Sequence, residues 1–126
     1  MKKKNFTPFE DLEVWQDSHA FVLKIYRTTN TFPKYELFNL TSQLRRSATS
    51  IPTNIVEGLF RQTRKELLNF LYIARGSAGE TMYHLILTRD LKYITQEQLS
   101  KLRSDLDSIL KQLNGWIRNL KKKSES

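Results

Sequence analysis

The sequence predicts an all-α protein, an antiparallel up-down-up-down four-helix bundle with a proline-kinked second helix. Three observations favour this fold class. The chain of 126 residues is long enough for one domain and short for two. Only four glycines and three prolines are available to build turns, which favours a few long helices over many short strands. Apolar residues recur three or four positions apart over long stretches, which is the period of one helix face.

The first predicted helix covers residues 10–29. Its first turn is acidic, as the positive end of a helix dipole prefers. The segment 30–36 ends it, because Pro33 keeps Phe32 out of the helical region. The nine residues 1–9 are expected to form a flexible basic N-terminus. The residues expected to face inward are Leu12, Trp15, His19, Val22, Ile25 and Tyr26.

The second predicted helix covers residues 36–60 and runs through Pro52. A proline inside a helix removes a backbone donor and crowds the carbonyl four residues back, at a cost of about 3 kcal/mol. An end before the proline would leave Ile51, Ile55 and Leu59 in a loop, whereas a continuous helix buries each of them for roughly 1.5–3 kcal/mol. Burial outweighs the cost, so we expect one helix that bends at the proline. Its inward stripe is Leu37, Leu40, Leu44, Ala48, Ile51, Ile55 and Leu59.

The third predicted helix covers residues 63–92. Thr63 and Glu66 have the spacing of a capping box, in which each side chain accepts from the other residue's backbone donor. The segment 74–81 holds two glycines but lacks the lysine and the preceding strand of a phosphate-binding loop. We expect its small residues to let two helices approach closely. The inward positions are Leu67, Phe70, Leu71, Ala74, Ala78, Thr81, Leu85 and Thr88.

The fourth predicted helix covers residues 95–120 and opens with a second capping box, Thr95 to Gln98. Its apolar residues alternate steps of three and four, which is a heptad seam. Short connections between long helices favour antiparallel neighbours. Residues 121–126 are expected to be a flexible basic C-terminal tail. The seam consists of Leu99, Leu102, Leu106, Ile109, Leu113, Trp116 and Leu120.

The second helix also carries apolar residues on the side opposite its core stripe. One interpretation is a solvated surface, because single exposed hydrophobic residues are common. The interpretation that we favour is an interface with a second copy of the chain, since an apolar outer face suits contact between subunits. The expected interface residues are Thr49, Thr53, Val56 and Phe60.

The formal net charge is +8, which favours polyanions as partners. Much of this charge comes from lysines near the two termini. Inside the folded part, the surplus lies in the middle third of the chain, where six basic residues face only Glu57 and Glu66. Such a set can contact nucleic-acid phosphates, although a solvated, ion-paired surface is the alternative. The expected nucleic-acid-binding residues are Arg45, Arg46, Arg61, Arg64, Lys65 and Arg75.

Several function classes are not expected. The chain has no cysteine, which excludes disulfides, thiol nucleophiles and cysteine-based zinc sites. Its two histidines, His19 and His84, lack metal-binding spacing, and no serine is paired with a base, so we expect no metal, no cofactor and no catalytic residues. The chain shows neither a signal peptide nor an apolar stretch of ~20 residues that could span a bilayer. A cytoplasmic protein without membrane contact is therefore expected.

Three segments resemble the bacterial four-helix-bundle proteins encoded by intervening sequences within 23S rRNA genes: FEDLEVWQDSHAFVLKIYRTT, FPKYELFNLTSQLRRSATSIPTNIVEGLFR and KELLNFLYIARGSAGET. The stretch QLRRSATSIPTNIVEG is the most specific part of a resemblance that covers residues 9–120. The resemblance implies a bundle with a proline inside its second helix, assembled as a ring-shaped homopentamer. A related protein of this fold, the accessory variability determinant of diversity-generating retroelements, is a basic pentamer that binds nucleic acid and a reverse transcriptase. No catalytic residue follows from the resemblance.

The function that we expect is therefore non-enzymatic: a homo-oligomer, a pentamer by the resemblance, that binds RNA or DNA through basic surfaces. Repetition around a ring would strengthen weak phosphate contacts through effective concentration. The alternative is a protein-interaction scaffold or accessory subunit without a direct nucleic-acid role, with a protein such as a reverse transcriptase as its partner.

Overall fold

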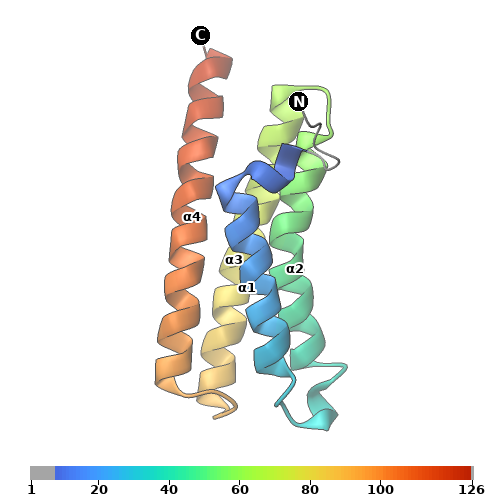
Figure 1. The fold of residues 1–126 in the computed structure, drawn as a ribbon, viewed down its shortest axis with the longest axis vertical. Coiled ribbons are helices and arrows are strands. Elements are labelled where there is room, and N and C mark those ends of the chain that lie inside the picture. The colour runs from blue at the N-terminus through green and yellow to red at the C-terminus, as the bar shows by residue number, and fades with distance from the viewer. Residues whose placement is uncertain (1–7, 126) are drawn as a thin grey trace, which may run out of the picture.

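The computed structural model describes residues 8–125, and the elements in this range are all helical. Figure 1 shows four long helices side by side, with the chain running down, up, down and up again. α1 and α3 each pack against both α2 and α4. The all-α four-helix bundle is therefore confirmed, and no helix within the described range is long and apolar enough to cross a membrane. The elements are η1 Pro8–Asp11, α1 Glu13–Thr29, η2 Lys34–Glu36, α2 Leu40–Leu59, α3 Arg64–Asp90 and α4 Gln96–Glu125.

Both capping boxes are present. At the start of α3, the Thr63 hydroxyl accepts from the Glu66 backbone N–H at 3.1 Å, and the Glu66 carboxylate accepts from the Thr63 N–H at 3.3 Å. At the start of α4, Gln98 and Thr95 make the matching pair of bonds, at 2.8 Å and 3.1 Å. These local signals therefore place the starts of α3 and α4 within one residue of their predicted positions.

The start of α2 and the end of α4 differ from prediction. α2 begins at Leu40 and not at residue 36, because Glu36 belongs to the short helix η2, where its carboxylate accepts from the Leu40 N–H at 3.4 Å. α4 continues to Glu125 and does not end at residue 120, so residues 121–125 of the expected tail belong to the helix. Lysines form helices well and suit the negative end of the helix dipole. At the other terminus, residues 1–7 of the expected flexible segment lie outside the described residues, and η1 follows.

The inward face of α1 is rotated from the predicted one. Val22 and Ile25 are buried as expected, but His19 and Tyr26 are exposed, and Trp15 is only half-buried. The predicted inward stripe did not include two polar residues that are buried in the structure. Ser18 and Thr29 tolerate burial because their hydroxyls donate to the carbonyls of Val14 and Ile25, at 2.7 Å and 2.8 Å. The buried residues of α1 are Val14, Ser18, Phe21, Val22, Ile25 and Thr29.

α2 is one helix through Pro52, and the residues beyond the proline join the core. Ile51 and Ile55 are both 0% exposed, so the expected burial is confirmed. The bend at Pro52 stays a prediction. Leu37 is exposed because it precedes the helix. The seam of α4 is buried almost as predicted, with Ile117 buried in place of the half-buried Trp116.

Close approach of α2 and α3 depends on Gly58. A Cβ atom at this position would lie 2.9 Å from Leu67 Cδ1 and 3.0 Å from Phe70 Cβ. Gly76 and Gly79 do not serve the expected close packing, because both are exposed and a Cβ atom at either would meet nothing within 4 Å. In the segment 74–81 the small residues that pack into the core are Ala74 and Ala78.

Gly58→Ala is expected to lower the free energy of unfolding by about 1–3 kcal/mol, because Phe70 Cβ is held by the α3 backbone and the added methyl group overpacks the contact. Gly76→Ala is the matched control. It adds the same methyl group in open space and should raise stability by about 0.5–1 kcal/mol through better helix propensity. Urea unfolding of both variants measures the difference. A stabilising effect of Gly58→Ala would contradict the close approach.

Hydrogen bonds among Tyr35, Tyr93 and Glu36 link the η2 segment to the α3–α4 connection. The Tyr93 hydroxyl donates to Glu36 Oε2 at 2.8 Å and lies 3.3 Å from the Tyr35 hydroxyl. The pKa of Tyr93 is raised well above its ordinary value. The hydrogen bond with Tyr35 is the largest cause, and the hydrogen bond with the Glu36 carboxylate is the second.

This raised pKa predicts a loss of stability in alkali. Above about pH 10 the unfolded chain releases the Tyr93 proton while the folded chain keeps it, so the unfolded state gains stability as pH rises. Urea unfolding between about pH 8 and pH 11 should therefore show a steeper decline for the native chain than for Tyr93→Phe. Equal slopes would contradict the assignment.

Candidate nucleic-acid interface

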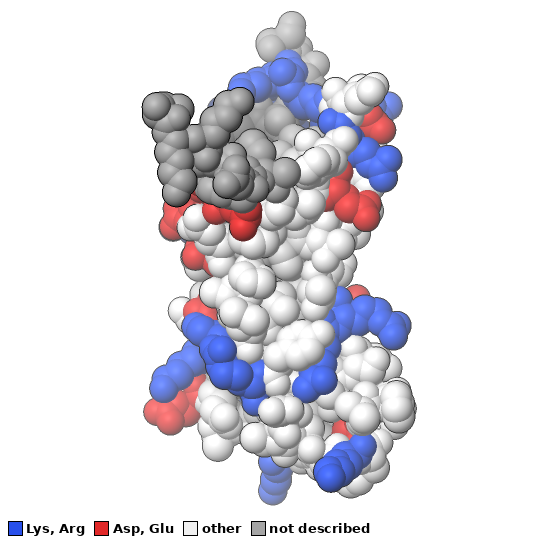
Figure 2. All heavy atoms as spheres, turned by 45° about the vertical axis from the view of Figure 1, so that its right-hand side comes forward, with Lys and Arg blue, Asp and Glu red and all other residues white. Residues whose placement is uncertain are grey.

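The six basic residues expected to bind nucleic acid lie in three separate places. Arg45 and Arg46 lie on the first half of α2, and Arg61 follows its end, sixteen residues later. That separation is about 24 Å along the helix axis at 1.5 Å per residue. Arg75 lies further along α3 and donates to Asn114 of α4 at 3.1 Å. Figure 2 shows basic side chains at the top and across the lower half of one face, with acidic side chains and an uncharged band between them.

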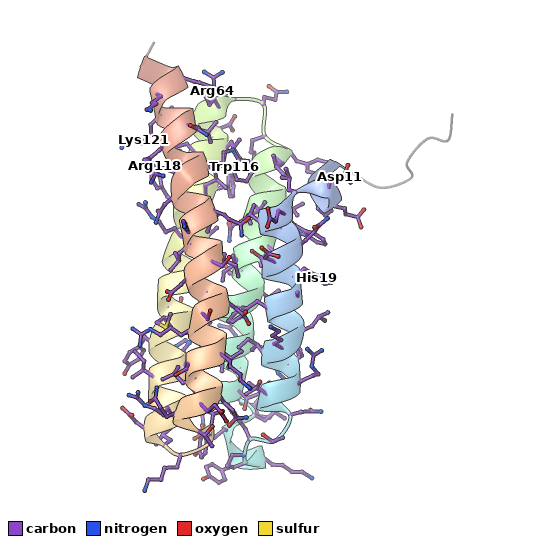
Figure 3. All side chains as sticks on the ribbon, turned by 60° about the vertical axis from the view of Figure 1, so that its left-hand side comes forward. Asp11, His19, Arg64, Trp116, Arg118 and Lys121 are labelled. Carbon is purple, nitrogen blue, oxygen red and sulfur yellow. The ribbon has the colours of Figure 1, made fainter. Side chains whose placement is uncertain are left out.

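The upper group combines residues of the α2–α3 connection, the start of α3 and the end of α4. Arg64 and Lys65 begin α3 and are exposed, and Arg118 and Lys121 from the last turns of α4 are exposed at the same end (Figure 3). Asp11 lies at this end too, but on the opposite side of the bundle in this view. We call the exposed cationic set the basic end. It consists of Arg61, Arg64, Lys65, Arg118, Lys121 and Lys122.

Lys121 and Lys122 were missed from sequence because the fourth helix was predicted to stop at residue 120, and Arg118 was missed although it lies inside the predicted helix. The signal that was available is the absence of any proline or glycine after Gly115. Lysines favour helix, so α4 continues and carries its last cations alongside the start of α3.

The electrostatics of the basic end favour an anion. Arg64 and Lys65 lie in the first turn of α3, where the helix dipole already contributes positive potential. Glu66 offsets part of this charge through the capping box. Arg61 is also partly compensated, since it lies 3.7 Å from Glu57 and stacks over the Phe70 ring at 4.8 Å. An incoming phosphate would relieve the remaining repulsion.

Arg45 and Arg46 line a hollow between α1, α2 and the segment before α2. We call it the α1–α2 hollow. Its volume of 630 Å³ lies within the range typical of ligand sites. None of the residues that line it is acidic. They are Tyr26, Leu37, Phe38, Thr41, Ser42, Arg45, Arg46, Thr49, Ser50 and Thr53.

Arg45 is held in place inside this hollow. Its Nε donates to Thr29 Oγ1 at 2.8 Å, and its guanidinium lies 4.6 Å from the centre of the Tyr26 ring. Within residues 8–125, neither Nη group has a hydrogen-bond partner. The neighbouring Arg46 is exposed. The two arginines therefore offer one oriented cation and one solvent-exposed cation to an anion.

The expected interface residues line a second groove, directly above the hollow. Thr49 and Thr53 border both, and Val56 borders the groove alone. From α1 the groove receives Trp15 and His19, whose rings stack 5.0 Å apart. The exposure of these α1 rings extends the apolar outer face that the sequence suggested only for α2. Phe60, the fourth expected interface residue, is 65% exposed beyond the end of α2.

The family model for the 23S rRNA-intervening sequence protein matches residues 10–115 of this chain. The chain belongs to this family. A crystal structure of a protein with unknown function from the S23 ribosomal protein family of Bacteroides thetaiotaomicron has the same fold, with a TM-score of 0.77 and 34% sequence identity. The match covers 82% of this chain and 97% of the other. None of the curated proteins matches.

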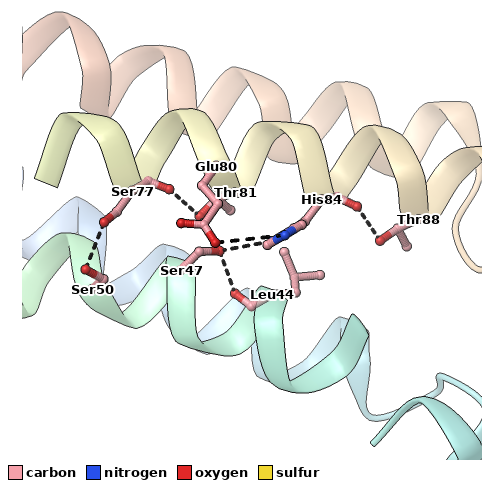
Figure 4. Close-up of polar contacts among 8 residues, drawn as sticks. All are labelled: Leu44, Ser47, Ser50, Ser77, Glu80, Thr81, His84 and Thr88. Carbon is pink, nitrogen blue, oxygen red and sulfur yellow. Dashed lines mark hydrogen bonds and ion pairs between the residues drawn. The ribbon is translucent and has the colours of Figure 1, made fainter. Parts of the chain in front are cut away.

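In this family member, the stretch QLRRSATSIPTNIVEG lies along α2 and supplies both arginines of the hollow. The same stretch supplies the polar seam that joins α2 to α3 (Figure 4). Thr81 Oγ1 donates to Ser47 Oγ at 2.8 Å, and Ser77 Oγ donates to Ser50 Oγ at 2.8 Å. Buried and satisfied hydroxyls of this kind set the register of two packed helices.

The seam also brings together a serine, a histidine and a carboxylate, which is the order of an acyl-transfer triad. His84 Nδ1 lies 3.5 Å from Ser47 Oγ, and His84 Nε2 lies 4.0 Å from Glu80 Oε2. Both separations are long for hydrogen bonds of a triad, and Ser47 is only 3% exposed. Ser47 instead accepts the hydrogen bond from Thr81 that joins α2 to α3.

Proposed function

We propose that this intervening-sequence protein is a non-enzymatic protein that binds RNA or DNA through its basic end. The observation that carries the proposal is the gathering of cations from α3, α4 and the α2–α3 connection at one end of the bundle. Phosphate contacts supply most of the affinity of non-specific nucleic-acid binding and position the bound strand. Side chains at helix termini reach such phosphates without steric cost from the rest of the bundle.

We further propose that the protein acts as a homo-oligomer, with the groove that Trp15, Thr53 and Val56 line as the contact with a second copy. The groove supports this because it presents stacked rings and apolar side chains to solvent in the single chain. A ring would place several basic ends together, so that weak phosphate contacts add through effective concentration. Five copies are the number that the sequence resemblance implies.

The binding proposal is tested by fluorescence anisotropy with a labelled RNA hairpin and a labelled DNA duplex across a salt series. We expect saturable binding whose logarithmic salt slope is steep, about −0.9 per phosphate contacted on a duplex. Absence of saturable binding at about 50 mM salt, where contacts to phosphate are strong, would contradict the proposal. Retention of a specific protein from nuclease-treated extract, together with that absence, would favour the scaffold function.

The oligomer proposal is tested by light scattering on a sizing column. We expect a mass near five times the 14.9 kDa of one chain. Val56→Asp should lower the mass, because it places a charge inside the contact. Leu91→Asp is the control, since Leu91 is 45% exposed at the α3–α4 connection and borders neither groove nor hollow. A native mass of one chain would overturn the proposal.

A further inference from the structure

We propose that the α1–α2 hollow binds one unpaired nucleotide of a nucleic-acid strand, with the base against aromatic and guanidinium planes and the phosphate on two arginines. This inference rests on the proposed function, because the ligand is the same polymer. It adds a second site, on the first half of α2, which would distinguish a single strand from a duplex and would not respond to charge alone.

Two planar surfaces line the hollow. Phe38 is 88% exposed, the largest value among the large hydrophobic residues of the described chain. A phenylalanine in water contributes nothing to the core, so its ring is free for a ligand. The Arg45 guanidinium, which covers the Tyr26 ring at 4.6 Å, presents a second plane. Unpaired bases stack on both kinds of surface.

The cations of the hollow suit a phosphate attached to that base. Arg45 is fixed through Nε and through Tyr26, so less conformational entropy is lost when its Nη groups bind an anion. Arg46 is adjacent and exposed. No carboxylate lines the hollow to compete for either arginine. A guanidinium fork pairs with two phosphate oxygens at once.

The combination favours an unpaired nucleotide over the other anions. A duplex offers phosphates but keeps its base planes stacked inside, so it leaves the Phe38 ring without a partner. A purely acidic peptide such as polyglutamate pairs with Arg45 and Arg46 but has no flat ring to lie against Phe38. A nucleotide in a single strand supplies both the plane and the charge. The hydroxyls of Thr41 and Ser42, which also line the hollow, are available to sugar and base edges.

The test compares a labelled single-stranded RNA of about eight nucleotides, a length within the range that single-strand-binding proteins occupy, with the same sequence as a duplex. Phe38→Ala should weaken single-strand binding about tenfold and leave duplex binding unchanged. Because Phe38 is 88% exposed, this variant should keep the native unfolding midpoint. Tyr83→Ala is the matched control, since Tyr83 is 61% exposed on α3 and should change neither affinity.

A second variant tests the phosphate contact. Arg46→Gln should weaken single-strand binding and reduce the salt slope by about 0.7, the value of one phosphate on a single strand. Arg103→Gln on α4 is its control, because it removes an equal charge from an exposed residue outside the hollow. Displacement of the strand by micromolar adenosine monophosphate would assign the site to free nucleotides, and displacement by longer strands alone would assign it to a polymer. Either result supports the nucleotide chemistry.

Three results would overturn the hollow as a nucleotide site. The first is that Phe38→Ala binds the single strand as tightly as the native chain, while charge reversal at the basic end abolishes binding. That result would leave the proposed function standing. The second is a lower oligomer mass for Phe38→Ala without a change in affinity, which assigns the hollow to contact between copies. The third is displacement by polyglutamate as effective as displacement by the strand. Loss of all nucleic-acid binding by the native chain would instead refute the proposed function itself.

Discussion

The triple variant Arg64→Glu, Lys121→Glu and Lys122→Glu is expected to lower affinity for an RNA hairpin at least about 100-fold at 0.15 M salt. The three side chains come from the start of α3 and the last turns of α4, and all are exposed at the basic end. Each lost phosphate contact should reduce the salt slope by about 0.9, and the new carboxylates repel the strand. Anisotropy titrations at several salt concentrations measure both effects.

A matched control separates local contacts from net charge. Lys101→Glu, Arg103→Glu and Lys111→Glu change the net charge by the same amount on exposed positions of α4 outside the basic end. We expect only a small loss of affinity from this control, through weaker long-range attraction that salt screens. If both triple variants bind equally, overall charge and not the basic end holds the nucleic acid.

Ile55→Ala is expected to lower the free energy of unfolding by about 2–5 kcal/mol, as much as Leu44→Ala. Both side chains are 0% exposed, and they lie on opposite sides of Pro52 in one helix. The large effect follows because each substitution removes buried apolar surface and leaves a cavity between α2 and its neighbours. Urea unfolding at one fixed protein concentration measures it, since an oligomer's stability depends on concentration.

The control for this prediction is Ile73→Ala. Ile73 is 50% exposed on α3, so its truncation should cost no more than about 1 kcal/mol. An Ile55→Ala effect as small as that of Ile73→Ala would show that the segment after Pro52 is not packed in the core. The assignment of α2 as one continuous helix, which orients the hollow relative to the basic end, would then be wrong.

Local signals predicted most of the fold. The capping boxes at Thr63 and Thr95 involve residues three positions apart, so the sequence contains all that they need. The heptad seam of α4 and the apolar stripe of α2 are likewise periodic within one helix. The same stripe predicted that α2 continues through Pro52, because the buried residues keep their phase across it.

Other features were not predictable in this way. The buried face of α1 includes Ser18 and Thr29, whose hydroxyls bond to their own helix and so remove the cost of burial. The close contact of α2 with α3 uses Gly58, since it depends on Leu67 and Phe70 of the other helix. In the candidate site, Arg118 was missed because its neighbours at the start of α3 are far from it in the chain, and Lys121 because the predicted helix ended at residue 120.

For this protein, the sequence by itself determined the number of helices, their order and the seams of α2, α3 and α4, since caps and periodicity act within a few residues. Tertiary structure alone decided which cations share an end of the bundle and which rings border the hollow. Those neighbours depend on the rotation and axial register of packed helices, and residues far apart in the chain set both.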